Sequence, residues 1–399
     1  MKTVLFVCYG SGHVRMVLPV ARALHEQRRA RVQILALTTA APVVRVAGLP
    51  LLQFKDFVLP GDVAALAHGE RLAASMTDVV DREETVAYLG LSYADLEAEV
   101  GAEEARRRYE RDARQAFLPR ATLRRILERV KPDLVVATNS PRAERAAIES
   151  ARELGIPSVC IVDLFAIDEV RWIGRPGYAD KVCVLNEDVK RFLVDAGRRP
   201  GEIEVTGNPA FDGLFDPAVR AQGHALRASH EWTDRRVLLW AEQVEPALHP
   251  FDGRPGDPTL PARALDALID WTERNADAVL CIRPRPGQAF RLPRASARIL
   301  LTDQDWPLAP LLHATDCVVT LTSTVGVEGH LAGTRVVQVR GSVFDEAMPL
   351  ARFGLADAAV PVAELHTALD TVTRLGRRPL AQSESPATGR VLPVVRAFL

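Results

Sequence analysis

Residues 316–339 constrain the fold of this chain more than any other stretch. They open with 317–321, a short run of apolar and β-branched side chains that is typical of a buried parallel strand. Residues 322–324 are Thr, Ser and Thr, which favour the N-cap of a helix, and we expect that helix at 325–332. A glycine then predicts the helix end, and 336–339 predicts a second strand. The pattern predicts an α/β unit with a parallel sheet.

The turn between the predicted strand and helix has the chemistry of a phosphate site. Small hydroxyl residues at a helix N-terminus leave backbone N–H groups free beside the positive end of the helix dipole. Glu328 lies one turn into the helix, where a carboxylate can accept from the two hydroxyls of a ribose. This predicts a nucleotide site made of Ser323, Thr324, Val325, Gly326 and Glu328. The alternative is an ordinary β-α-β unit in which Glu328 is a solvated surface residue.

These residues resemble the donor-nucleotide site of GT-B glycosyltransferases. In that family a small-residue turn holds the diphosphate, a following glutamate holds the ribose, and an Asp-Gln or Asp-Glu pair after the next strand holds the sugar. Residues 347–354 contain the Ala-Arg-Phe-Gly sequence expected beyond that pair. The resemblance implies that Asp345 and Glu346 contact the donor sugar. It also implies that Asp303 and Trp306, at the entrance of the preceding helix, border the base.

A pair of arginines follows another predicted strand, at 278–282. In Arg283-Pro-Arg285-Pro the prolines fix two guanidinium groups at the strand edge, which favours an anion clamp. The position resembles the Lys/Arg-Pro-His-Pro segment of glycerophosphotransferase-like and polysialyltransferase-like GT-B families. Because Arg285 stands where those families have histidine, the resemblance implies phosphate contact but not the histidine's role. Pairing of the two arginines with surface carboxylates is the alternative.

The chain begins with a further strand and a glycine-rich turn. Residues 3–8 predict a strand, 9–14 a turn, and 15–28 a helix with one apolar face. In a doubly wound domain such a turn lies at the carboxyl edge of the sheet, where ligands bind. The spacing is not G-x-G-x-x-G, because Arg15 stands at the third glycine position. A dinucleotide-binding fold is therefore disfavoured.

Residues 10–24 resemble the opening of many GT-B enzymes, which read Gly-His, then Pro, then Ala-x-x-Leu. In several inverting members this histidine deprotonates the acceptor hydroxyl. The resemblance implies that His13 is the catalytic base, a role that suits the pKa range of histidine. A turn histidine bonded to nearby backbone is the alternative. The resemblance also implies that the loop seats the acceptor through Gly10, Ser11, Gly12 and Arg15.

Two more predicted strands end in polar side chains. Residues 133–138 lead to Asn139, and residues 158–162 lead to Asp163. Because the carboxyl ends of parallel strands meet at one edge of a sheet, we expect both side chains close to His13. We predict that they orient His13 or contact the acceptor. The alternative for Asp163 is a cap on the segment that follows it.

A length of 399 residues is too long for one ordinary core and favours two domains. Residues 203–212 resemble the Val-Thr-Gly-Asn segment at the interdomain hinge of the non-hydrolysing UDP-N-acetylglucosamine 2-epimerases, which share the GT-B architecture. Gly207 and Asn208 are therefore hinge candidates. We expect an α/β protein of GT-B architecture, with two Rossmann-like doubly wound domains facing each other across a cleft. The expected parts are an acceptor-side domain at 1–215, a nucleotide-sugar donor domain at 216–385, and a C-terminal segment at 386–399 that can return to the first domain.

Composition excludes several classes of partner. A formal net charge of −1 provides no field that would recruit nucleic acid or an anionic membrane. No stretch approaches about 18 consecutive apolar residues, so no membrane span is expected. The five cysteines lack partners at metal-ligand spacing, which predicts buried reduced thiols, no metal site and a cytoplasmic location.

Residues 103–131 carry ten basic against five acidic side chains. The segment is also amphipathic, so a docking surface for an anionic acceptor, or for lipid headgroups at the inner face of the cytoplasmic membrane, is one interpretation. Solvated helices that pack on the sheet are the plainer interpretation, and we favour it.

The first hypothesis is an inverting, metal-independent glycosyltransferase of bacterial polysaccharide biosynthesis. It would move a sugar from a nucleoside-diphosphate donor to a glycan, lipid-linked or small-molecule acceptor, with no cofactor beyond the nucleotide-sugar substrate. A UDP-N-acetylglucosamine 2-epimerase is second, although the epimerases' Gly-Thr-Arg-Pro-Glu and Leu-His-Arg-Arg-Glu-Asn segments are missing here. A CDP-glycerol or CMP-sugar transferase is third, and a scaffold that only binds a nucleotide or a protein is fourth. A homodimer is left open.

Overall fold

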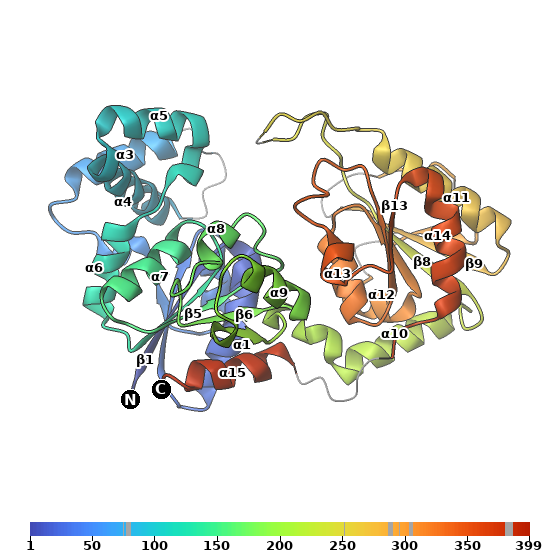
Figure 1. The fold of residues 1–399 in the computed structure, drawn as a ribbon, viewed down its shortest axis with the longest axis horizontal. Helices are drawn as coiled ribbons and strands as arrows, with labels where there is room; N and C mark the ends of the chain where they lie inside the picture. The colour runs from blue at the N-terminus through green and yellow to red at the C-terminus, as the bar shows by residue number, and fades with distance from the viewer. Residues whose placement is uncertain are drawn as a thin grey trace. The chain divides into compact units, whose positions relative to one another are not determined.

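The computed structural model describes residues 1–74, 76, 81–250, 252–285, 290–294, 296–302, 306–379 and 386–399, without the side chain of Ser11. The chain forms two compact units (Figure 1). The first comprises Met1–Ala210 with Ser385–Leu399, and the second comprises Phe211–Glu384. Each unit is built on its own parallel β-sheet. The predicted α/β class with two doubly wound sheets is confirmed.

The sheet of the first unit has seven strands in the order β3-β2-β1-β4-β5-β6-β7. The winding direction reverses between β1 and β4, so these two neighbours form the topological switch point of the unit. All of β4 is buried, as expected for a strand with helices on both faces. The strands are β1 (Thr3–Tyr9), β2 (Arg31–Leu37), β3 (Leu51–Leu52), β4 (Leu134–Thr138), β5 (Ser158–Ile161), β6 (Lys181–Val184) and β7 (Ile203–Val205).

The first strand runs directly into helix α1 (Gly10–Glu26), so the turn predicted at 9–14 is wrong. Gly10 has a φ of +76°, a left-handed conformation that lets one residue make the reversal from strand to helix. His13 therefore lies at the start of a helix, next to the end of β1, and not in a loop.

The C-terminal helix α15 (Ala387–Arg396) is part of the first unit and lies beside α1 (Figure 1). Val391, Leu392 and Val395 are buried in the same core as α1 and β1. Near the chain ends, Lys2 Nζ donates to the Phe398 carbonyl at 2.9 Å. The last residues thus complete the hydrophobic core of the N-terminal unit.

The basic segment at 103–131 is mostly helical. Its basic helices also pair with carboxylates outside the segment, such as Arg120 with Glu99 at 3.0 Å and Arg125 with Asp62 at 3.0 Å. Such pairs neutralise part of the excess positive charge, as the solvated-helix interpretation expects. The remaining helices of the unit are α2 (Ala40–Val46), α3 (Val63–Ala73), α4 (Arg82–Val100), α5 (Ala102–Asp112), α6 (Arg120–Val130), α7 (Ala143–Glu153), α8 (Val170–Ile173) and α9 (Glu187–Asp195), with short 3-10 turns at Phe54–Phe57, Ala113–Ala116 and Pro200–Glu202.

The second unit has a six-stranded parallel sheet in the order β10-β9-β8-β11-β12-β13. Alternate residues of β8 enter opposite cores: Leu238 and Trp240 pack in one, Val237 and Leu239 in the other. The switch point of this sheet lies between β8 and β11. The strands are β8 (Arg236–Ala241), β9 (Ala278–Arg283), β10 (Ile299–Leu301), β11 (Cys317–Thr320), β12 (Arg335–Val339) and β13 (Ala358–Val360).

The predicted strand–helix–strand pattern is confirmed as β11, α13 (Thr324–Leu331) and β12. Helices cover both faces of this sheet, with α11 and α14 in one core and α12 in the other (Figure 1). The helices are α10 (Pro217–Ser229), α11 (Leu260–Arg274), α12 (Leu308–Ala314), α13 and α14 (Leu365–Val372), with 3-10 turns at Pro209–Phe215, Leu350–Phe353, Val362–Glu364 and Thr373–Leu375.

Candidate functional site

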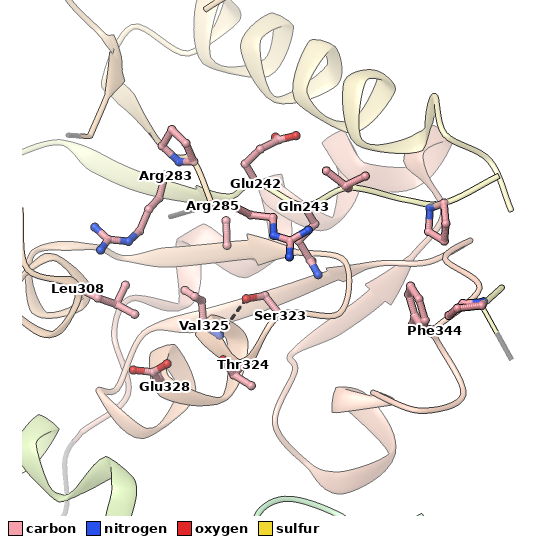
Figure 2. A pocket seen from close by; sticks show the side chains of 15 residues that line it. Glu242, Gln243, Arg283, Arg285, Leu308, Ser323, Thr324, Val325, Glu328 and Phe344 are labelled. Atoms are coloured by element: carbon pink, nitrogen blue, oxygen red, sulfur yellow. Dashed lines mark hydrogen bonds between the residues drawn. The ribbon is translucent and has the colours of Figure 1, made fainter. Parts of the chain in front are cut away.

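A pocket of about 690 Å³ lies at the switch point of the second unit, where β8, β9 and β11 end. Open α/β sheets bind ligands at this place, because the chain leaves neighbouring strands in opposite directions there. Figure 2 shows the side chains that line it. They are Ala241, Glu242, Gln243, Val244, Pro246, Pro250, Arg283, Pro284, Arg285, Leu308, Ser323, Thr324, Val325, Glu328 and Phe344.

The turn from β11 into α13 forms one wall of this pocket. Ser323 is the N-cap residue: its backbone is extended, and its Oγ accepts from the Val325 N–H at 3.2 Å. Thr324 and Val325 follow in the first turn and line the pocket. The positive end of the helix dipole therefore lies at the pocket wall, as the phosphate-site hypothesis requires.

Gln243 fixes the shape of this turn. Its Oε1 accepts from the Thr320 hydroxyl at 3.0 Å, from the Leu321 N–H at 3.1 Å and from the Thr322 N–H at 2.8 Å. Its Nε2 donates to the Thr322 hydroxyl at 3.2 Å. The sequence analysis did not identify Gln243, although its place just after a buried strand at the same sheet edge was a usable signal.

The two predicted arginines line the pocket in different ways. Arg283 ends β9, and its Nη1 donates to the Trp306 carbonyl at 2.8 Å. Burial lowers the pKa of Arg283, and the charge of Glu328 opposes this shift. Arg285 is exposed and lies after the strand end. The Arg283 guanidinium is thus anchored to the protein, whereas Arg285 lines the pocket as an exposed side chain.

Glu328 lines the pocket one helical turn beyond Ser323 (Figure 2). Gly326, between them, is buried against the sheet. A Cβ at this position would lie 2.7 Å from Leu350 Cδ1 and 3.0 Å from Thr320 Cγ2. The glycine therefore sets how closely α13 approaches β11.

Of the two residues predicted to border the base, the structure describes Trp306, which is not among the lining side chains. The Trp306 ring lies 4.8 Å from the His230 ring and 6.0 Å from the Trp232 ring, so it belongs to an aromatic cluster, and only its carbonyl serves Arg283. Asp303 lies outside the described residues.

The predicted donor-sugar pair lines a separate pocket of about 340 Å³, beside Gln338 and Arg340. Asp345 Oδ2 accepts from the Gly341 N–H at 2.7 Å, and burial raises the pKa of Asp345. Glu346 is exposed and pairs with Arg254 at 3.2 Å. The structure therefore does not bring Asp345 and Glu346 into the pocket that holds Ser323 and Glu328, because only the preceding Phe344 lines that pocket.

In the first unit, His13 lies at the switch point between β1 and β4. Its Nδ1 is 2.6 Å from the hydroxyl oxygen of Thr138, the last residue of β4. Thr138 Oγ1 in turn donates to Oε1 of the buried Glu144 at 3.3 Å. Neither Thr138 nor Glu144 was identified from the sequence, because a buried threonine and a glutamate on a helix carry no local signal.

Asn139 and Asp163 bond to each other. The Asp163 N–H donates to Asn139 Oδ1 at 2.9 Å, and Asn139 Nδ2 donates to Asp163 Oδ1 at 3.5 Å. Asn208 joins them, since its Nδ2 donates to the Asp163 carbonyl at 2.6 Å. These side chains tie together the ends of β4, β5 and β7. The hydrogen bond of His13 runs instead to Thr138.

The other hinge candidate, Gly207, has a φ of +76°. It lies against the C-terminal helix, where Arg390 Nε donates to the neighbouring Thr206 carbonyl at 2.7 Å. The first unit ends three residues later, at Ala210.

A second pocket of the first unit, of about 540 Å³, opens next to the start of α1. Gly10 lines it, whereas Gly12 and Arg15 are exposed on α1. Arg142 lies over the Tyr9 ring at 4.4 Å, and Arg114 Nη1 donates to the Tyr9 hydroxyl at 3.2 Å. The pocket also reaches buried Tyr88 and Glu84. Burial raises the pKa of Glu84 to about 7, against backbone donors that lower it.

The described residues contain no cluster of His, Cys, Asp or Glu that could hold a metal ion. All five cysteines are buried free thiols, as predicted. Within the described residues, every helix is too short or too polar to cross a bilayer.

No protein-family model matches the sequence, and no curated protein resembles it. Solved structures do resemble the fold. MurG of Acinetobacter baumannii has a TM-score of 0.57 at 17% identity, covering 100% of each chain. UDP-GlcNAc 2-epimerase of Neisseria meningitidis, bound to UDP-GlcNAc, has a TM-score of 0.55 at 12% identity, covering 98% of this chain and 99% of that chain.

The glycotransferase of kitacinnamycin has a TM-score of 0.51 at 15% identity, covering 100% of this chain and 95% of that chain. These likenesses extend over nearly the whole of each chain. The protein therefore has the two-domain GT-B fold that these enzymes share.

Proposed function

We propose that the protein is a glycosyltransferase that uses a nucleoside-diphosphate sugar. The observation that carries the proposal is the pocket of the second unit. This pocket is lined by a helix N-terminus that Gln243 shapes, by a carboxylate one turn later and by two arginines. This set matches the parts of a nucleoside diphosphate, with the positive helix end and the guanidinium groups for phosphate and Glu328 for ribose.

The pocket favours departure of a diphosphate. When the bond between the anomeric carbon and the diphosphate breaks, negative charge grows on the leaving oxygen. Donors that are already oriented stabilise that charge without rearranging. The positive end of the α13 dipole is fixed in this way, and the guanidinium of Arg285 adds positive charge at the same pocket. They would allow departure of the diphosphate without a metal ion.

We assign His13 the role of base. The acceptor oxygen would form a bond to the anomeric carbon while the bond to the diphosphate breaks. The hydroxyl proton would pass to the ring nitrogen of His13 that does not face Thr138. A single displacement of this kind inverts the anomeric carbon. We propose that Asp345 and Glu346 contact the donor sugar. This role requires that their neighbouring pocket opens towards the first pocket when the donor binds.

An epimerase is the second candidate. UDP-N-acetylglucosamine 2-epimerases are among the similar folds, and one of them was solved with UDP-GlcNAc bound. The segment from Val205 to Asn208 resembles their hinge. Against this candidate, the histidine and the two arginines that the epimerases carry after the hinge are replaced here by Trp240, Ala241 and Glu242, and Gln243 stands where they have glutamate. In this structure Gln243 serves to hold a turn.

The test is calorimetric titration with UDP, TDP, GDP, CDP and CMP on the wild type, Glu328→Ala and Glu364→Ala. Glu364 is an exposed glutamate of the same unit and serves as the control. We expect one diphosphate to bind the wild type and the control, and to bind Glu328→Ala at least about 10-fold more weakly. Binding of CMP or CDP alone would favour the cytidine-dependent transferases. Absence of binding by all five would refute the proposal.

The second candidate needs a separate assay. The wild type is incubated with the sugar nucleotide of the matching base and followed by proton NMR. A transferase leaves the sugar nucleotide intact until an acceptor is added, and then releases the free diphosphate. Conversion into the 2-epimer without acceptor would identify an epimerase and overturn the transferase proposal.

A further inference from the structure

Three side chains from separate elements, one of them His13, form a hydrogen-bonded line. His13 comes from α1, Thr138 from the end of β4 and Glu144 from α7. His13 Nδ1 lies 2.6 Å from Thr138 Oγ1, and Thr138 Oγ1 lies 3.3 Å from Glu144 Oε1. We refer to these residues as the His13–Thr138–Glu144 triad.

Burying the inner end of the triad, Thr138 and Glu144, costs folding free energy. Thr138 and Glu144 are both fully buried, and Glu144 Oε2 has no hydrogen-bond partner among the described residues. Burial raises the pKa of Glu144, while the charges of His13 and Arg142 lower it. A buried carboxyl group with so few partners destabilises a fold relative to an apolar side chain, so its presence points to a role in the site.

Other groups face Glu144 as well. Arg142 precedes α7, Tyr9 and Cys8 belong to β1, and Tyr88 belongs to α4. Cys160 of β5 and the buried Tyr178 feel its charge more weakly. Of these, Arg142 is the cation, and it lies over the Tyr9 ring. The side chain that hydrogen-bonds the Glu144 carboxyl group is Thr138, and backbone hydrogen bonds at Tyr9 and Glu144 also lower its pKa.

The direction of the hydrogen bonds follows from the single proton of a threonine hydroxyl. A carboxylate only accepts, so Thr138 must donate to Glu144. The Thr138 oxygen then accepts from His13, which places a proton on Nδ1 and leaves a lone pair on Nε2. Without an acceptor at position 144, the hydroxyl proton becomes available to His13 Nδ1, and the imidazole reverts to carrying its proton on Nε2.

We propose that Glu144, acting through Thr138, is a positioning residue that holds His13 in the tautomer whose Nε2 can receive the acceptor proton. The inference rests on the proposed function, since it needs His13 as base. The proton taken from the acceptor hydroxyl goes to Nε2, and Nδ1 keeps its own. No proton reaches Glu144, whose charge instead stabilises the imidazolium that forms. A base oriented by a third group is a general arrangement in catalysis.

The experiment reads the tautomer directly and needs no substrate. The full chain is labelled with ¹⁵N-histidine, two-bond proton–nitrogen correlations report which ring nitrogen is protonated, and His13→Gln assigns the signal. We expect the wild type and Thr138→Ser to carry the proton on Nδ1. Glu144→Leu and Thr138→Val are expected to shift it to Nε2. Glu153→Leu, the same change at an exposed glutamate of α7, should resemble the wild type.

Each outcome decides the proposal. A wild type with the proton on Nε2, or a Glu144→Leu variant identical to the wild type, would overturn it. Because leucine removes a buried charge without adding a polar group, this variant is expected to fold. Should it not fold, Thr138→Val against Thr138→Ser still decides whether the triad sets the tautomer.

Activity assays separate this inference from the proposed function. With an identified donor and acceptor, Glu144→Leu should lower kcat by about 10²-fold or more and leave KM for the donor unchanged. Retention of full activity by His13→Gln would refute the catalytic role of His13, whatever the tautomer. A wild-type tautomer in Glu144→Leu, together with an inactive His13→Gln, would refute the positioning role alone.

Discussion

Gln243 Oε1 lies 2.8 Å from the backbone nitrogen of Thr322, and this contact joins the end of β8 to the turn that opens α13. The two residues are 79 positions apart in sequence. The side-chain amide satisfies backbone groups that a tight turn leaves exposed, and it does so at the switch point where the pocket lies. The shape of the candidate phosphate site thus depends on a residue outside the turn.

Replacing Gln243 should weaken nucleotide binding by changing the shape of the turn that opens α13. In Gln243→Ala the N–H groups of Leu321 and Thr322 lose their acceptor, which costs about 1–3 kcal/mol for each buried group left unpaired. We expect a lower melting temperature and a Kd for the diphosphate raised at least about 10-fold. Gln115→Ala, at an exposed position of the first unit, is the control. Unchanged affinity in Gln243→Ala would show that the turn keeps its shape unaided.

We expect substitutions of Arg283 and Arg285 to differ: both should weaken nucleotide binding, but only one should lower stability. Because Arg285 is exposed, Arg285→Ala should leave the melting temperature unchanged. It should weaken diphosphate binding by about 10-fold, and this effect should be smaller at high salt. Arg283 holds the Trp306 carbonyl, so Arg283→Ala should lower both stability and affinity. Calorimetric titration at two salt concentrations, with thermal melts, checks both. Equal effects of the two variants would contradict this division.

Gly326→Ala should disturb the donor pocket through packing. The added methyl group would lie 2.7 Å from Leu350 Cδ1, and overpacking of this kind costs about 1–3 kcal/mol. We expect a lower melting temperature and weaker nucleotide binding, both partly restored by the second substitution Leu350→Ala. Gly61→Ala, where a Cβ meets no atom within 4 Å, is the control. A stable, fully binding Gly326→Ala variant would show that α13 can move without consequence.

Glu84 should make the first unit lose stability as pH rises. Burial raises its pKa from 4.5 to about 7, so between these values the folded state keeps a proton that the unfolded state has released. Stability is therefore fully present below about pH 4.5 and is lost as pH rises through about 7, by on the order of 3 kcal/mol.

Denaturant titrations across this pH range check the effect. Glu84→Gln should flatten the fall in the free energy of unfolding. Glu169, whose pKa burial also raises to about 7, should contribute a second part, so the slope should flatten further when Glu169→Gln is added. A Glu84→Gln variant with the wild-type slope would show that Glu84 is ionised in the folded protein throughout.

Local sequence alone determined much of the fold. The β-branched run before Thr322, the serine cap and the glycine after the helix predicted β11, α13 and β12 almost to the residue, because strand propensity, capping and helix termination act over a few neighbouring positions. Gly10 was assigned to a loop, since the sequence shows that a reversal is needed but not that one left-handed residue suffices. The positions of Arg283 at the end of a strand and of Glu328 in the helix after the turn followed from the same local patterns.

Tertiary structure decided which of these ends meet and what holds them. Gln243 reaches Thr322, and Glu144 reaches His13 through Thr138, only because parallel strands distant in the chain end side by side. The same geometry turned Asn139 towards Asp163 and placed Asp345 in its own pocket. Side-chain contacts of this kind depend on strand order and register, which no short stretch of sequence specifies.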